Sequence, residues 1–231
     1  MTINLSGELI PDEWAEVYEW FGYTTGFYSP MTIRKAIADL ADGEELVLEI
    51  NSVGGSVDAA SEIYSVIAKC DHPTRAEIQS MAASAASYLI LACDRVEIGL
   101  TAQMMIHRAS GGTYGNAEDH EWVAGVLRVT DASILNSYVA RCGEDKREEI
   151  KALMDAETYL SAEDALRLGR VDAIIGKQPA AEPQMIAASV HNNIVRAMKT
   201  LPDIHELIAR RDAERESVKN MISAAEERYK I

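Results

Sequence analysis

The chain has 231 residues, of which 48% are hydrophobic and 6% aromatic, and its formal net charge at pH 7 is −15. This length is enough for one large domain with an appendage. The acidic balance argues against nucleic-acid binding, which needs a basic surface, and against binding to anionic membranes.

Apolar patterns and turn signals predict alternating strands and helices along the first 176 residues. Expected helices cover residues 12–21, 30–41, 57–70, 82–93, 117–141, 144–154 and 161–169. Expected strands cover residues 46–50, 74–78, 95–98, 103–106 and 171–175. Strand–helix alternation is typical of parallel pairing, so the predicted fold class is α/β.

The composition changes after Gly176, where prolines and alanines indicate a linker. We therefore expect a domain at residues 1–176 and a linker with a helical C-terminal extension at residues 177–231. Within the extension, residues 184–199 and 203–229 have helical patterns, and the apolar positions of the second fall roughly on one face.

The cysteines and the amino-terminal segment indicate a reducing compartment. Cys70, Cys93 and Cys142 are odd in number and widely spaced, so the sequence predicts neither a zinc site nor a disulfide framework. Residues 1–7 lack the basic and apolar regions of a secretion signal, and no apolar run reaches the ~18 residues of a membrane span. We expect a cytoplasmic protein without a membrane partner.

Small residues surround a candidate nucleophile, Ser84, in the segment SMAASAAS at residues 80–87. If a helix begins near Ser84, the backbone N–H of Ala85 could bind an oxygen that becomes anionic during acyl transfer. Ser84 could instead be only a cap on a closely packed helix. Ser80 and Ser87 are competitors, of which Ser80 is expected at a strand end or turn and Ser87 as a buried hydroxyl.

Gly54 and Gly55 follow the strand predicted at residues 46–50. Because they carry no side chain, their backbone N–H groups can be approached closely and could supply a second oxyanion donor. The other half of such a site would be a base. His107 ends the strand predicted at residues 103–106 and could take a proton from Ser84, although a lone histidine is more often structural.

A histidine base needs an acid that fixes its tautomer. Asp155 and Glu157 both precede the helix predicted to start at Ser161, and either could accept the second ring proton of His107. Both could also be ordinary helix-entry charges. Spacing alone leaves the choice between them open.

Four motifs in this order resemble the ClpP serine peptidase family: NSVGG at residues 51–55, AAS at 82–84, MIH at 105–107 and YLSAEDA at 159–165. The resemblance spans roughly residues 3–176. Further segments are similar to the phage and prophage head-maturation branch, namely residues 12–14, 21–23, 115–119 and 154–158.

The resemblance implies a role for each candidate residue. Ser84 would be the nucleophile and His107 the general base, and the N–H groups of Gly55 and Ala85 would form the oxyanion hole, with Gly54 beside them. Glu157 would be the acid. The family usually has Asp at this position, so Asp155 stays an alternative.

The resemblance also implies an architecture and partners. We expect a crotonase-like body of superhelical ββα repeats with a long handle helix at about residues 117–141. Handle helices join homo-oligomeric rings, usually heptamers, into a barrel that degrades polypeptides, and neither a metal nor an organic cofactor is needed. Family members work with an ATP-driven unfoldase, but no docking surface for one is visible in this sequence.

The leading hypothesis is a serine endopeptidase that forms an acyl-enzyme, with phage scaffold and capsid subunits as expected substrates in the host cytoplasm or within proheads. One alternative is a crotonase-type acyl-CoA enzyme, which would share the oxyanion hole without needing a Ser–His pair. Another is a non-catalytic capsid assembly factor that binds partners through residues 177–231.

Overall fold

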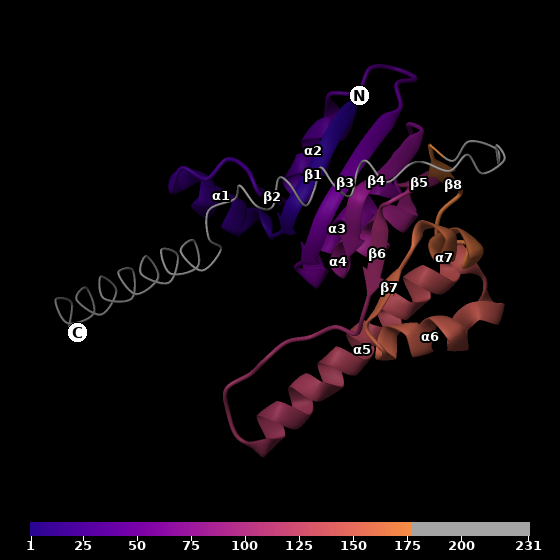
Figure 1. Ribbon diagram of the computed structural model, residues 1–231. Coiled ribbons are helices and arrows are strands. Elements are labelled where there is room, and N and C mark those ends of the chain that lie inside the picture. The colour runs from indigo at the N-terminus through magenta and orange to yellow at the C-terminus, as the bar shows by residue number, and fades with distance from the viewer. Residues whose placement is uncertain (177–231) are drawn as a thin grey trace, which may run out of the picture. The chain divides into compact units, whose positions relative to one another are not determined.

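The described part of the chain, residues 1–176 of the computed structural model, is organised around one eight-stranded sheet (Figure 1). The strands are β1 (Thr2–Leu9), β2 (Phe27–Tyr28), β3 (Leu46–Gly55), β4 (Thr74–Ala83), β5 (Arg95–Gly99), β6 (Gln103–Ile106), β7 (Thr158–Leu160) and β8 (Ala173–Ile175). The linker and helices predicted at residues 177–231 lie outside the described residues.

Helices connect most of these strands. The α-helices are α1 (Asp12–Trp20), α2 (Pro30–Ala38), α3 (Val57–Ile67), α4 (Ala85–Leu89), α5 (Ala117–Cys142), α6 (Arg147–Asp155) and α7 (Ala162–Arg167), and two short 3₁₀ helices are η1 (Ile90–Ala92) and η2 (Glu144–Lys146). Strand order is β2-β1-β3-β4-β5-β8, and every pair in this path is parallel. The predicted mixed α/β class is therefore confirmed.

Strand β4 is long enough to pair with two strands on the same side. Its first half, Arg75–Ile78, pairs with β5, and its second half, Met81–Ala83, pairs with β6. Strand β6 then pairs antiparallel with β7. The carboxyl ends of β3, β4 and β6 consequently meet at one place, where the polar and small residues singled out in the sequence are found.

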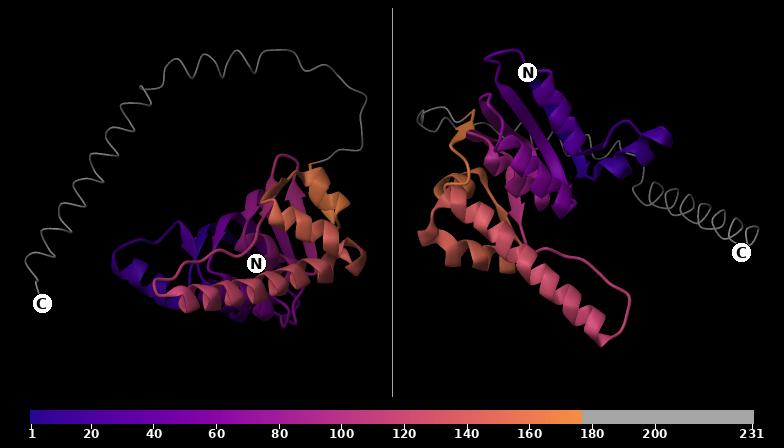
Figure 2. Two further views of the ribbon diagram at one scale, coloured as in Figure 1. Left: turned by 90° about the horizontal axis from the view of Figure 1, so that it is seen from below. Right: turned by 180° about the vertical axis from the view of Figure 1, so that it is seen from behind.

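Helix α5 has 26 residues and two different halves. Its buried residues, Ile134, Tyr138 and Val139, all lie in the second half, which packs against the rest of the domain. The first half projects beyond the sheet, with the segment that leads into it alongside (Figure 2). It leaves Trp122, Val126 and others of its apolar side chains exposed.

Three predicted boundaries are wrong near the site. The helix expected from residue 82 begins at Ala85, because Ala82 and Ala83 still pair with β6 as part of β4. Strands β3 and β4 each run five residues beyond the ends predicted for them, to Gly55 and Ala83. Small residues have weak preferences, so pairing with neighbouring strands decides their conformation.

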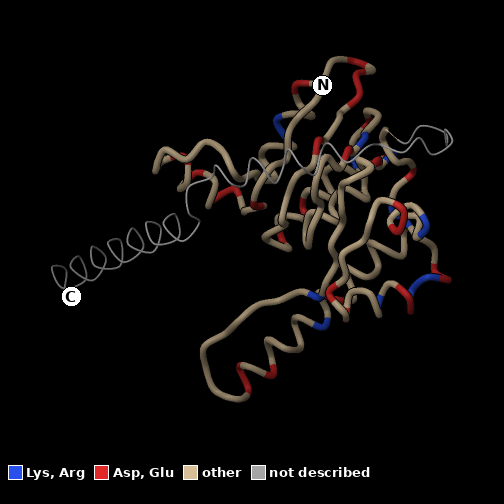
Figure 3. Tube along the Cα trace, viewed as in Figure 1, with Lys and Arg blue, Asp and Glu red and all other residues tan. Residues whose placement is uncertain are grey.

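Acidic residues are spread over most of the described elements rather than gathered on one (Figure 3). Within residues 1–176 no group of three or more His, Cys, Asp or Glu side chains is arranged to hold a metal ion. Over the same range, no helix is both long enough and apolar enough to cross a membrane.

Candidate active site

Ser84 occupies a sharp turn between β4 and α4. Its backbone angles are φ 53° and ψ −125°, a conformation that costs a non-glycine residue on the order of 1–3 kcal/mol. The Ser84 N–H donates to the carbonyl of Met105 on β6 at 2.9 Å, which ties the turn to the neighbouring strand. Strain of this kind persists only where the surroundings hold it, and it is often found at functional sites.

The imidazole of His107 lies directly against the Ser84 hydroxyl. Nε2 of His107 is 2.6 Å from Oγ of Ser84, which is hydrogen-bonding distance. The reason is the sheet register: Ala83 pairs with Met105, so the residues that follow each strand end are brought together. Both residues are half-buried, so the pair is shielded but still reachable from solvent.

Gly54 packs so closely on Ser84 that no side chain could replace its hydrogen. A Cβ atom at Gly54 would lie 2.7 Å from Cβ of Ser84 and 2.9 Å from the backbone nitrogen of Ala85. Gly54 also has φ +90°, a conformation that favours glycine. Gly55 is equally constrained, because its Cβ would lie 2.0 Å from the carbonyl oxygen of Leu9. The structure therefore brings the predicted glycine pair onto the predicted nucleophile.

The buried side chains of Ser52 and Tyr28 form hydrogen bonds that hold the turn at Gly54. The Gly54 N–H donates to Oγ of Ser52 at 3.1 Å, Ser52 donates to the carbonyl of Gly7 at 2.7 Å, and the Tyr28 hydroxyl donates to Ser52 at 2.9 Å. Burial raises the pKa of Tyr28 to about 12, so this hydroxyl keeps its proton. Sequence reasoning assigned no role to Ser52, because the strand was predicted to end at residue 50 and β3 in fact continues to Gly55.

Asp155 lies near the site but its carboxylate is engaged elsewhere. Its Oδ1 accepts from Nε of Arg108 at 2.6 Å, and its Oδ2 accepts from Nζ of Lys151 at 2.8 Å. The hydrogen bond from Lys151, followed by that from Arg108, holds the pKa of Asp155 below its usual range. Both oxygens are thus committed to cations, and neither is bonded to His107.

Glu157 and His107 flank the same end of the β6–β7 ladder. Ile106 and Thr158 form its last pair, His107 follows Ile106, and Glu157 precedes Thr158. Glu157 has φ +50°, and it and Ser84 are the two non-glycine residues within 1–176 that have a positive φ. In that same range no hydrogen bond joins the exposed Glu157 side chain to His107.

The two competing serines have other environments. Ser80 is exposed on β4, inside the strand rather than at its end. Ser87 is fully buried, as predicted, and its hydroxyl donates to the carbonyl of Ser84 at 2.6 Å. Of the serines in this segment, Ser84 is therefore the one that contacts a histidine.

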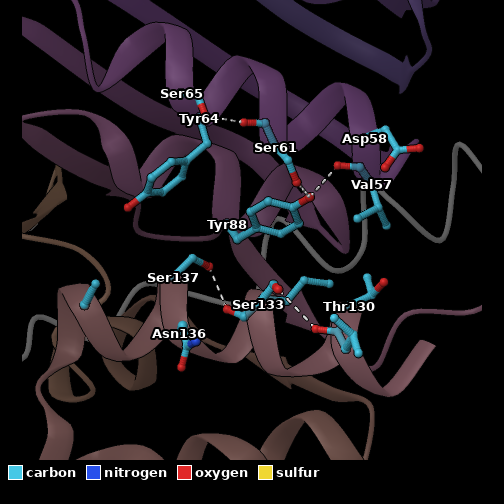
Figure 4. Close-up of a pocket in the computed structure, with 13 residues that line it drawn as sticks. Val57, Asp58, Ser61, Tyr64, Ser65, Tyr88, Thr130, Ser133, Asn136 and Ser137 are labelled. Carbon is cyan, nitrogen blue, oxygen red and sulfur yellow. Dashed lines mark hydrogen bonds between the residues drawn. The ribbon is translucent and has the colours of Figure 1, made fainter. Parts of the chain in front are cut away.

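A small cavity at Ser84 continues into a larger groove between α3 and α5. Val57, Tyr88 and Ile134 line both spaces. The groove has a volume of about 520 Å³, and polar side chains such as Ser61 and Ser137 share its walls (Figure 4). The Tyr88 hydroxyl donates to the carbonyl of Val57 at 2.9 Å, which fixes its ring between the two helices.

Comparison with known proteins identifies the family. The model for the Clp protease family matches residues 35–178, which include every candidate site residue named above. The chain belongs to the Clp protease family. Over 137 residues it is 35% identical to the ATP-dependent Clp protease proteolytic subunit 1 of Chlamydia muridarum (strain MoPn / Nigg), covering 58% of this chain and 71% of that protein.

The same subunit of Chlamydia trachomatis serovar D is also 35% identical over 137 residues, with the same coverage of both chains. The resemblance to ClpP found in the sequence is thereby confirmed, and the chain is a ClpP-like serine peptidase. The family match begins within α2, so β1, α1 and β2 precede the matched region.

Proposed function

We propose that this ClpP-like peptidase hydrolyses polypeptides with Ser84 as nucleophile and His107 as general base. The 2.6 Å contact between Nε2 and Oγ carries the proposal. His107 takes the hydroxyl proton as Oγ attacks the substrate carbonyl, and it returns that proton to the leaving amine. A water molecule, activated by the same imidazole, then releases the acyl group and restores Ser84.

The backbone N–H groups of Gly55 and Ala85 are proposed as the oxyanion donors. Ser52 already binds the N–H of Gly54, which favours Gly55 over its neighbour as the second donor. Ala85 is the first residue of α4 and follows the nucleophile directly. Main-chain donors held in this way stabilise the tetrahedral intermediate without having to reorganise during the reaction.

The first test is covalent labelling by a fluorophosphonate, which reacts with an activated serine. We expect a single adduct by intact-mass analysis, and peptide mapping should place it on Ser84. A protein that stays unlabelled and copurifies with an acyl-CoA would instead favour the crotonase-type alternative. An adduct on Ser80 or Ser87 would contradict the assignment of the nucleophile.

Glu157 is proposed as the acid that orients His107. Two observations support this choice: both residues adjoin the last pair of the β6–β7 ladder, and Asp155 is bound to two cations. We expect Glu157→Gln to slow the reaction of Ser84 with a fluorophosphonate by about 10²–10⁴-fold, since the amide cannot stabilise the imidazolium. Asp155→Asn is the matched control and should stay within about threefold of the unsubstituted protein. If the two variants exchange these effects, Asp155 is the acid.

The proposed substrate site is the groove that continues from Ser84 past Val57, Tyr88 and Ile134. We also propose that copies of the chain form rings and that the exposed apolar positions of α5 contribute to contacts between them. Head maturation of a phage, with scaffold or capsid subunits as substrates, is proposed from the similarity of residues 12–14 and 115–119 to that branch. Coexpression with such subunits, followed by mass spectrometry of their termini, tests this.

A further inference from the structure

A chain of buried polar groups runs beneath the turn that carries Ser84. The guanidinium of Arg170, which follows α7, lies over the ring of Tyr138 on α5, with Cζ 3.9 Å from the ring centroid. The Tyr138 hydroxyl is 2.6 Å from Oγ of Ser87 on α4, and that Oγ is 2.6 Å from the carbonyl oxygen of Ser84. Arg170 and Ser87 are 0% exposed and Tyr138 is 1% exposed.

The direction of these hydrogen bonds follows from the groups involved. A carbonyl oxygen can only accept, so the single hydroxyl hydrogen of Ser87 goes to Ser84. Tyr138 must therefore donate to Ser87. Burial raises the pKa of Tyr138, which keeps its hydroxyl protonated, and the nearby charge of Arg170 acts in the opposite direction by polarising that O–H bond. The Tyr138 hydroxyl thus donates to Ser87, and the Ser87 hydroxyl donates to the carbonyl of Ser84.

Burying the charged side chain of Arg170 carries a large desolvation penalty. Within residues 1–176 none of its three guanidinium nitrogens has a hydrogen-bond partner, and the Tyr138 ring is its close electrostatic contact. A buried charge without hydrogen bonds usually lowers stability compared with an apolar side chain of similar size. A residue that is kept despite this cost is a candidate for a functional role, because function and stability often conflict at active sites.

We propose that Arg170, Tyr138 and Ser87 are positioning residues that hold the Ser84 carbonyl, and with it the strained turn, so that Oγ stays on His107. The proposal rests on the proposed role of Ser84 as nucleophile. The Ser84 carbonyl also accepts the backbone N–H of Ser87 at 3.0 Å. The side-chain bond therefore adds a second anchor to a backbone whose φ of 53° is unfavourable for serine.

Three single variants of the full chain test the proposal: Ser87→Ala, Tyr138→Phe and Arg170→Met. The measurement is saturation kinetics of Ser84 labelling by a fluorophosphonate, which separates the maximal labelling rate from probe affinity. We expect Ser87→Ala and Tyr138→Phe to lower the maximal rate about tenfold, the effect of losing one buried hydrogen bond, while probe affinity stays unchanged. Arg170→Met should lower the rate about threefold without lowering the melting temperature.

A double-mutant cycle tests whether the residues act in series. In the Tyr138→Phe background, Arg170→Met should change the labelling rate by less than about 1.5-fold, because the hydroxyl through which it acts is gone. Thr74→Val is the matched structural control, since it removes another buried hydroxyl, bonded to Asp94 at 2.9 Å at the opposite end of β4. It should lower the melting temperature and leave the labelling rate unchanged.

Labelling rates of Ser87→Ala and Tyr138→Phe within twofold of the unsubstituted protein would overturn the proposal. So would rate losses that follow the melting temperature across all variants, Thr74→Val included. If Tyr138→Phe does not fold, Ser87→Ala, which removes one oxygen atom, and Arg170→Met decide the question. If the unsubstituted chain is not labelled at Ser84, the proposed function itself fails. That result differs from one in which Ser84 is labelled and Tyr138→Phe does not change the labelling rate, which contradicts only the positioning role.

Discussion

Replacing Ser84 with Ala should remove fluorophosphonate labelling and lower the turnover of an unfolded protein substrate by about 10⁶-fold, the loss seen when a nucleophile that acts as part of a triad is deleted. The physical reason is that Oγ is the proposed nucleophile, so without it His107, whose Nε2 lies 2.6 Å from Oγ, has no hydroxyl from which to take a proton. His107→Ala should lower the turnover nearly as much as Ser84→Ala does. Combining the two should add little further loss, because they act as one unit.

Ser80→Ala is the control for this experiment. Ser80 is exposed on β4, four residues before Ser84, and its hydroxyl is not bonded to His107. We expect its turnover and labelling to match those of the unsubstituted chain. Turnover that survives in Ser84→Ala and disappears in Ser80→Ala would show that the nucleophile has been misassigned.

The second large effect is expected for Gly54→Ala. The added Cβ would lie 2.7 Å from Cβ of Ser84, so the serine or the glycine turn must move. Displacing a reacting group by about 1 Å can cost about 10²-fold in rate, and we expect at least that loss in the maximal labelling rate of Ser84. Far-ultraviolet circular dichroism and the melting temperature will show whether the fold itself is kept.

Gly22→Ala separates the steric effect from backbone strain. Gly22 has φ +86°, close to the +90° of Gly54, but a Cβ there would meet nothing within 4 Å. Both variants therefore carry similar conformational strain, whereas only Gly54→Ala presses on Ser84. If the two variants lose activity equally, or if Gly54→Ala is as active as the unsubstituted chain, the close packing between Gly54 and Ser84 has no catalytic importance.

The pattern of apolar residues was sufficient for most of the fold. Helix α5 was predicted at residues 117–141 and lies at Ala117–Cys142, and α2, α3, β5 and β6 also lie where the sequence predicted them. These elements have either a long helical period or a short apolar run, and such local signals survive in the folded chain.

Strands β1, β2 and β7 were not predicted. Strand β1 carries few apolar residues, yet Leu5 and Leu9 are completely buried in the hydrophobic core, and β1 pairs on both sides, with β2 and β3. Strands β2 and β7 have two and three residues. Segments this short or this polar gain their conformation from a neighbouring strand, which a local pattern cannot reveal.

The sequence motifs contained every residue proposed for catalysis. They did not show which of the alternative candidates meet in the folded chain. Spacing left Asp155 and Glu157 equal, and it could not say whether Ser84 meets His107. The β4–β6 register brings the serine and the histidine together, Glu157 and His107 adjoin the last pair of β6 and β7, and two cations are bound to Asp155. The two registers join segments that are far apart in the chain, since Ala83 pairs with Met105 and Ile106 with Thr158.

The amino-acid sequence by itself determined the α/β class, the family resemblance and the candidate nucleophile, base and glycine turn, because each depends on residues that are close together in the chain. Only the tertiary structure decided that Ser52 supports Gly54 and that Ser87, Tyr138 and Arg170 lie beneath Ser84. Those contacts join α4, α5 and the segment after α7. They form only when the hydrophobic core brings these elements together and removes their polar groups from water.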